Sequence, residues 1–203
     1  MEKLDKTLIE HHPWGFFLPE NTHLLMLGSF PPPRIRWSMD FYYPNIQNDM
    51  WRILGLLFYA DKDYFLETPK SFSKEKCRTF CHKVGLGLGD TGMEVIRQKG
   101  NASDKFLEIV KPIDLEGVLA SIPSCRAIVV TGQKAMDTLL SVIRERTLIE
   151  EPQVGEAEPF TYVGRTLNLY RMPSSSRAYP KPLAEKARVY QRMFVQLGLL
   201  PGV

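Results

Sequence analysis

Short apolar runs alternate with longer amphipathic stretches along the chain, a pattern that predicts strands alternating with helices. Residues 23–29 are almost uniformly apolar, as in a strand that is buried on both faces. The prolines at 31–33 cannot continue a helix or pair in a sheet, so the chain must leave this strand as an extended loop. Residues 126–130 predict a second such strand, and Gly132 opens a helix directly after it.

Apolar residues at helical spacing predict the elements that cover these strands. The first expected helix is capped by Asn48 or Asp49, and the others cover residues 70–83, 114–121, 132–143 and 182–198. Residues 160–163 and 166–170 flank Gly164-Arg165, which is a hairpin signal. Strands that alternate with helices favour an α/β fold, a three-layer α/β/α sandwich with a central, mostly parallel short sheet.

Gly85, Gly87 and Gly89 predict a flexible connector that leads into a strand over residues 91–98. They resemble a nucleotide-binding loop only superficially, because that fingerprint needs a preceding strand and a following helix. The phosphate-loop lysine motif is also absent from the sequence. Residues 100–104 are expected to form another loop.

The length of 203 residues suits one domain over 1–203, in which residues 1–20 form an N-terminal extension. A hydrophobic content of 44% and a charged content of 24% are typical of a soluble globular protein. No apolar run approaches the length of a membrane span, so no membrane association is expected. Three cysteines are too few for a disulfide framework, and we therefore expect a cytoplasmic protein.

Two kinds of chemistry lack the residues that they need. Cys77 and Cys81 share a helix face next to His82, but no second pair completes a four-ligand metal site. We therefore expect neither a metal nor a cofactor. The chain has four histidines, and none lies in a segment that pairs obviously with a serine, which disfavours a serine hydrolase.

The remaining candidate site consists of the loops that follow the first and last predicted strands. The first loop supplies Gly28 for close backbone approach, and then aromatic rings and amides from Phe30, Tyr42, Tyr43, Asn45 and Asn48. The last loop supplies a Pro-Ser-Ser-Ser stretch and Arg177. Rings, amides and hydroxyls suit a flat heterocycle on a phosphodiester chain. The alternative is that two stiff loops merely turn the chain.

The net charge of +3 says little about partners. The local distribution of basic residues is more informative. Basic side chains lie in or near both loops, namely Arg34, Arg36, Arg165, Arg171, Arg177 and Lys181. Two basic loops from distant parts of the sequence could converge on a polyanion, although solvated surface charge is an equal alternative.

Four segments between about residues 22 and 198 carry a resemblance to a known family. They are Gly28-Ser29-Phe30-Pro31-Pro32, Tyr42-Tyr43, Asn45-Ile46-Gln47-Asn48-Asp49-Met50-Trp51 and Met172-Pro173-Ser174-Ser175-Ser176-Arg177-Ala178. The ordered set resembles the uracil-DNA glycosylase superfamily, and within it the branch of hypoxanthine (deoxyinosine) DNA glycosylases. The resemblance implies a monofunctional DNA glycosylase that hydrolyses the N-glycosidic bond of a deaminated base, uracil or hypoxanthine, in base excision repair. The implied partner is DNA that contains a damaged base, with no obligate protein partner.

The resemblance also implies a role for each part of the site. Asn48 stands where the hypoxanthine branch carries its water-positioning asparagine. The flipped base would be bound by Gly28, Ser29, Phe30, Tyr43 and Asn45, with Phe30 or Tyr43 stacked on it. The DNA-binding loop would consist of Pro173, Ser174, Ser175, Ser176 and Arg177, with Lys181 beyond it.

Two departures from the family pattern leave an alternative open. Phe30 stands where better-known branches carry a catalytic Asp or Asn, and Met172 where they carry a His or Asn that stabilises the leaving base. The alternative is a catalytically weak or inactive DNA-binding module on the same scaffold. A third hypothesis, a hydrolase-like or phosphotransfer enzyme of small nucleotides, lacks a nucleophile–base pair and a phosphate-loop lysine.

Overall fold

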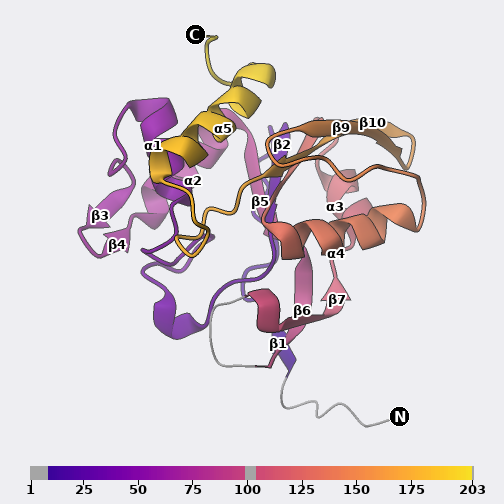
Figure 1. The fold of residues 1–203 in the computed structure, drawn as a ribbon, viewed down its shortest axis with the longest axis horizontal. Coiled ribbons are helices and arrows are strands. Elements are labelled where there is room, and N and C mark those ends of the chain that lie inside the picture. Colours follow the sequence, from indigo (N-terminus) through magenta and orange to yellow (C-terminus); the bar gives the residue numbers. More distant parts are fainter. Residues whose placement is uncertain (1–8, 99–103, 203) are drawn as a thin grey trace.

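A computed structural model describes residues 9–98 and 104–202 (Figure 1). Its main sheet has the strand order β5-β2-β8-β10-β9, in which the first four strands are parallel and β9 is antiparallel to β10. The strands are β2 (Leu24–Gly28), β5 (Leu86–Asp90), β8 (Ala127–Thr131), β9 (Ala157–Tyr162) and β10 (Arg165–Met172). Residues 1–8 of the expected extension and most of the expected loop over 100–104 lie outside the described residues.

Helices cover both faces of this sheet, so the predicted three-layer α/β/α arrangement is confirmed (Figure 1). One layer consists of α1 (Met50–Tyr59), α2 (Lys74–Val84) and α5 (Leu183–Gln196), and the other of α3 (Leu115–Ser121) and α4 (Gln133–Arg144). Strand β2 shows why its sequence is uniformly apolar. Leu24 and Met26 pack with the first layer, whereas Leu25 and Leu27 pack with the second.

Two elements begin at residues other than those expected. Helix α2 starts at Lys74, because β4 (Ser71–Phe72) pairs with β3 (Leu66–Thr68). The hairpin turn between β9 and β10 consists of Val163 and Gly164, with φ values of 43° and 75°. Two left-handed residues make the turn that fits twisted strands, so Arg165 is already the first residue of β10.

The prediction of a flexible connector at residues 85–89 is wrong, because Leu86–Asp90 form the buried strand β5. The side chain of Leu88 packs into the core on one side of the sheet. On the other side, a Cβ at Gly89 would lie 2.4 Å from the ring of Phe16. The glycine therefore makes room for the N-terminal segment, where Phe17 and Leu88 exchange two backbone hydrogen bonds.

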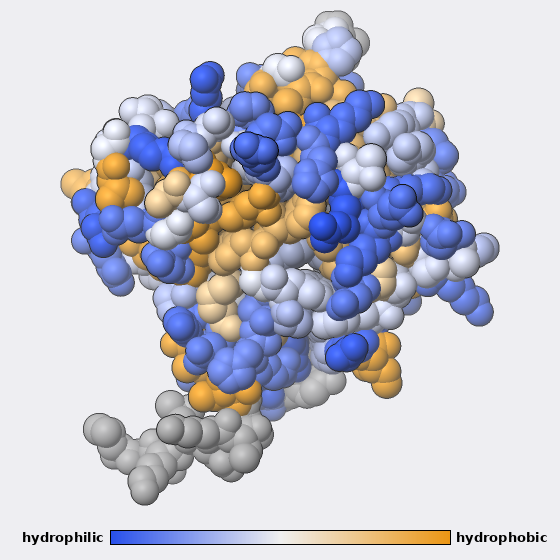
Figure 2. Space-filling view, turned by 180° about the vertical axis from the view of Figure 1, so that it is seen from behind, coloured by the Kyte–Doolittle hydropathy of each residue, from blue (hydrophilic) through white to orange (hydrophobic). Residues whose placement is uncertain are grey.

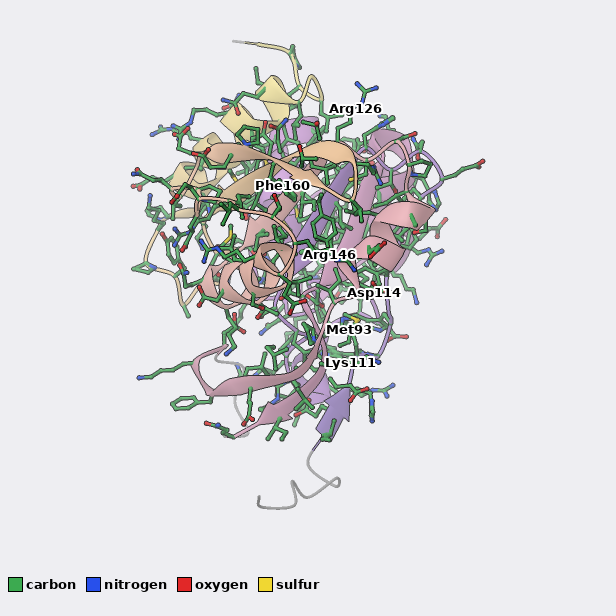
Figure 3. The ribbon with its side chains drawn as sticks, turned by 90° about the vertical axis from the view of Figure 1, so that its right-hand side faces the viewer. Met93, Lys111, Asp114, Arg126, Arg146 and Phe160 are labelled. Carbon is green, nitrogen blue, oxygen red and sulfur yellow. The ribbon has the colours of Figure 1, made fainter. Side chains whose placement is uncertain are left out.

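A second, antiparallel sheet, which the sequence pattern does not predict, has the order β1-β6-β7. Its strands are β1 (Ile9–His11), β6 (Gly92–Arg97) and β7 (Leu107–Pro112). The strand expected over 91–98 is β6, which pairs here rather than in the main sheet. Figure 3 shows Met93 and Lys111 of this sheet at one end of the molecule and Arg126, which precedes β8, near the other. The second sheet therefore lies beyond the carboxyl ends of the parallel strands.

Candidate functional site

The four parallel strands direct their carboxyl ends toward one cleft of about 600 Å³. Gly28 ends β2, Asp90 ends β5 and Thr131 ends β8, while Ser174 follows the end of β10 by two residues, and all four line the cleft. Ligands of open α/β sheets bind in the crevice at this edge. The two loops that sequence analysis singled out therefore meet at one site.

Backbone hydrogen bonds join the first loop (residues 29–49) to the late loop (residues 173–178). Asn48 and Ser176 form an isolated antiparallel bridge. The N–H of Asp49 donates to the carbonyl oxygen of Ser175 over 2.8 Å. The expected water-positioning asparagine and the expected DNA-binding loop therefore form adjoining parts of the cleft wall.

A buried ion pair holds this junction. Lys186 of α5 is 0% exposed, and its Nζ lies 3.3 Å from Asp49 Oδ2 and donates to the carbonyl oxygen of Ser176 over 2.8 Å. Arg177 Nε donates to the other carboxylate oxygen of Asp49 over 2.9 Å. Asp49 therefore holds the late loop with its side chain, and it makes no side-chain capping bond to α1.

The two asparagines of the first loop have side-chain oxygens that are fixed by the local backbone. Asn48 Oδ1 accepts from the N–H of Met50, and Asn45 Oδ1 accepts from the N–H of Gln47, each over 2.9 Å. Such turns hold the amide in one orientation. An amide oxygen has a second lone pair and its NH₂ group has two donors, so both side chains can also bind a ligand in the cleft that they line.

Phe30 and Tyr43 supply aromatic surface to the cleft. The ring of Phe30 meets His12 edge to face, with centroids 5.5 Å apart, and the Arg97 guanidinium lies 5.9 Å from its centroid. Tyr43 has a φ of 52°, which residues other than glycine rarely adopt, and its hydroxyl lies 3.4 Å from Thr131 Oγ1. Burial raises the pKa of the Tyr43 hydroxyl, which therefore stays protonated at physiological pH. Both rings are held in place before a ligand arrives.

The structure adds a pair that sequence analysis missed, His12 and Asp90. His12 Nε2 lies 2.8 Å from Asp90 Oδ2, while Nδ1 accepts from the N–H groups of Trp14 and Gly15 over 3.2 and 3.0 Å. Because Nδ1 is an acceptor, the ring hydrogen is assigned to Nε2, which donates it to the carboxyl group. His12 thus orients Asp90 at the cleft.

The carboxyl groups of the cleft have raised proton affinity. Burial raises the pKa of Asp90 above its usual range, and the hydrogen bond from His12 opposes that rise. A Cβ at Gly28 would lie 2.5 Å from Asp90 Oδ1, so the close approach of β2 to this carboxyl group requires glycine. Burial also raises the pKa of Asp104, whose Oδ1 accepts from the hydroxyl of Ser29 over 2.8 Å. Carboxyl groups with such shifts are candidates for acid–base chemistry.

The convergence of two basic loops is only partly confirmed. Arg36 and Arg177 line the cleft. Arg165 lies at the other end of β10, where its guanidinium donates to the carbonyl oxygens of Leu119, Ile122, Pro123 and Cys125. Arg171 pairs with Glu151 over 2.9 Å. The prediction that basic side chains converge at the cleft is therefore wrong for Arg165 and Arg171, which stabilise the fold instead.

Met172 ends β10 and Pro173 begins the late loop, and neither has a polar side chain. The side chain of Met172 is buried in the core that α1, α2 and α5 cover. The carbonyl oxygen of Pro173 accepts from the hydroxyl of Tyr190 over 2.8 Å, and Lys181 lies exposed beyond the loop. The side chain of Met172 therefore offers no hydrogen-bonding group to a ligand in the cleft.

The cysteines of α2 are part of the core. Cys77 and Cys81 are buried, and burial raises the pKa of both thiols. Over residues 9–98 and 104–202, no group of three or more His, Cys, Asp or Glu side chains is arranged to hold a metal ion. None of the helices found in those ranges combines the length and the apolar character of a membrane span.

These observations define an α/β/α protein with a ligand cleft at the carboxyl edge of a parallel sheet. The fold is similar to the solution NMR structure of a protein from Methanosarcina acetivorans named "putative Uracil DNA glycosylase". The TM-score is 0.60 and the sequence identity 23%, over 91% of this chain and 98% of that chain. No protein-family model matches the sequence, and no curated protein matches it. The predicted uracil-DNA glycosylase-like fold is thus confirmed, whereas the hypoxanthine branch stays a prediction.

Proposed function

We propose that this protein is a monofunctional DNA glycosylase that hydrolyses the N-glycosidic bond of a deaminated base, uracil or hypoxanthine, in DNA. The observation that carries the proposal is the bridge between Asn48 and Ser176, which brings amide, aromatic and hydroxyl groups around one cleft. The fold shared with the Methanosarcina protein supports it. The same cleft contains Asp90, a carboxyl group suited to proton transfer.

Base capture comes first, because a stacked base hides its glycosidic bond. Flipping the nucleotide out of the duplex costs a few kcal/mol. Phe30 or Tyr43 stacks on the flipped base, and the N–H groups of Ser29 and Phe30 bind its carbonyl oxygens and stabilise the departing anion. Arg177 and Lys181 contact phosphates, which sets the position of the DNA without reading its sequence.

Bond cleavage then requires a water that is aimed at the sugar. As the C–N bond breaks, its electrons leave with the base and C1′ gains oxocarbenium character. The amide of Asn48 orients a water on the open face, although an amide is no general base at neutral pH. The water oxygen bonds to C1′, and Asp90 is the candidate acceptor for its proton. His12 supports this role by fixing the carboxyl group.

A DNA-binding module with weak or absent catalysis is the second candidate function. The observations that favour it are the apolar Phe30 in the cleft and the burial of Met172 in the core. In better-known branches of the family that the sequence resembles, both positions carry polar groups. This candidate would bind DNA with a damaged base and release no base.

A panel of duplex oligonucleotides tests the proposal. Duplexes that carry uracil, hypoxanthine or xanthine are incubated with the protein and then treated with alkali, which breaks the strand at an abasic site. We expect breaks with at least one substrate. Binding without breaks would favour the binding module, and neither binding nor breaks would overturn both candidates. Turnover of free nucleosides would instead indicate an enzyme of small nucleotides.

A further inference from the structure

A short turn at the rim of the cleft exposes an isoleucine between two arginines. Residues Arg34–Arg36 form a single 3₁₀ turn, closed by hydrogen bonds from Arg36 N to Pro33 O (2.8 Å) and from Trp37 N to Arg34 O (3.0 Å). Ile35 is 94% exposed. Single exposed apolar side chains are common on protein surfaces, so the neighbours of Ile35 decide whether it marks a binding site.

The turn is held rigidly against the body of the protein. Prolines 31–33 precede it and restrict the backbone. On the other side, Trp37 Nε1 donates to the carbonyl oxygen of Pro32 over 2.8 Å, and the ring of Trp37 packs on Trp14 with centroids 4.6 Å apart. Ile35 therefore projects from a fixed support, as a side chain that enters a base stack must.

The charges next to Ile35 match a phosphate backbone. Arg34 and Arg36 are both exposed, and Arg36 lines the cleft. In the part of the chain that the structure describes, neither arginine forms an ion pair with a carboxylate. The Arg34 guanidinium lies 5.6 Å from the centroid of the Trp37 ring. Two arginines that flank an apolar tip can contact phosphates on both sides of an insertion point.

The late loop offers a poorer wedge than this turn. Residues 174–177 of the expected DNA-binding loop are the other candidates for filling the stack that the flipped base vacates. Ser175 is buried, Ser174 and Ser176 present hydroxyls, and Arg177 is tied to Asp49. Figure 2 shows hydrophobic areas as well as hydrophilic ones on the surface seen from behind, and Leu148 is as exposed as Ile35, so exposure alone does not mark a wedge.

We propose that Ile35 is a duplex wedge, which inserts between base pairs next to the flipped nucleotide while Arg34 and Arg36 bind the flanking phosphates. The partner is double-stranded DNA, and the inference rests on the proposed glycosylase function. A wedge replaces stacking that the flipped base has lost, so it matters only when the base starts in a duplex. A single-stranded substrate needs no such help.

The test compares one deaminated-base oligonucleotide in duplex and in single-stranded form. Ile35→Ala should lower the rate of base release from the duplex about tenfold and leave the single-strand rate unchanged. Ile35→Leu should restore most of the duplex rate. Leu148→Ala is the matched control, because Leu148 is 96% exposed and, unlike Ile35 with its neighbour Arg36, has no adjacent residue that lines the cleft, and it should change neither rate.

If the wild-type protein releases base, the proposed function is supported. Two outcomes would then still overturn the wedge. These are an unchanged duplex-to-single-strand ratio in Ile35→Ala and an equal loss on both substrates. If the wild-type protein releases no base, 2-aminopurine placed next to the lesion still tests the wedge through its fluorescence. Wild-type protein should raise that signal and Ile35→Ala should not, whereas equal signals, or no rise with either protein, would refute the wedge.

Discussion

Lys186 Nζ lies 3.3 Å from Asp49 Oδ2 at a position from which water is excluded. The contact links the last helix to the residue that precedes the first one, and a hydrogen bond to the carbonyl oxygen of Ser176 extends it to the late loop. A buried charge of this kind is stable only while its partners remain. The ammonium group of Lys186 therefore contributes to the junction together with Arg177, which pairs with the same carboxylate.

Replacing that ammonium group should destabilise the protein strongly. Lys186→Met removes the buried ammonium group from Asp49 and leaves it paired with the half-exposed Arg177, which we expect to lower the free energy of unfolding by about 3 kcal/mol. Urea denaturation measures the change, and Lys181→Met, on an exposed side chain, is the control with little effect. A loss of less than about 1 kcal/mol would show that the pair is not needed.

Asn48→Ala should remove most base release while DNA binding stays intact. Loss of an oriented water costs roughly 100-fold in rate. The substitution also removes the hydrogen bond from Met50 N, which is worth about 1 kcal/mol of stability. Asp61→Ala is the matched control, since Asp61 Oδ1 accepts from Asp63 N in the same kind of turn without lining the cleft. An undiminished rate in Asn48→Ala would assign the water to another residue.

Asp90→Asn should change how stability depends on pH. The pKa of Asp90 is higher in the folded protein than the value of about 3.9 in an unfolded chain, so the folded state binds more protons between these values. Stability that depends on the protonated carboxyl group is complete below about pH 3.9 and is lost as pH rises through the folded pKa. The unfolding free energy of the wild type minus that of the variant should therefore fall with pH, as urea denaturation can measure. A difference that rises would contradict the raised pKa.

The same substitution tests the catalytic role of Asp90. An asparagine cannot accept a proton at neutral pH, so the rate of base release should fall by roughly 100-fold or more. The rate of the wild type should rise with pH as Asp90 loses its proton, and the variant should lack this dependence. If the wild type and Asp90→Asn release base at equal rates at every pH, Asn48 would remain as the only proposed group that acts on the water.

Salt dependence tests the late loop as a phosphate contact. Arg177→Ala should weaken DNA binding and reduce the slope of log K against log salt by about 0.9. Arg188→Ala is the control, because Arg188 is exposed on α5 outside the residues that line the cleft. A slope that equals that of the wild-type protein would show that Arg177 only holds Asp49.

The sequence predicts the main sheet and the two loops because apolar runs and their stop signals are local. Residues 23–29 and 126–130 are such runs, and their loops meet because parallel strands share a carboxyl edge. The Leu-Gly-Leu-Gly-Asp stretch that ends at Asp90 was different, since glycines usually interrupt strands. Its alternation with a period of two was the available signal for β5. Glycine is needed at position 89 because the ring of Phe16, distant in the sequence, lies against it.

The pairing of His12 with Asp90 had no local signal at all. His12 lies before the first main strand, in a segment without apolar periodicity, and 78 residues separate it from its partner. The pairing of β1 with β6 and the bridge between Phe17 and Leu88 bring the two together. Pairs of charged or polar side chains that lie far apart in the sequence are set by the tertiary structure, as Asp49 and Lys186 also show.

The segment ahead of β2 has a practical consequence for shortened versions of the chain. A truncation that begins at residue 20 would expose the outer edge of β5, where Phe17 now pairs with Leu88, and invite strand-to-strand aggregation. It would also delete His12 and leave the Asp90 carboxyl group without its donor. Removal of this segment should therefore lower both the solubility of the protein and the rate of base release.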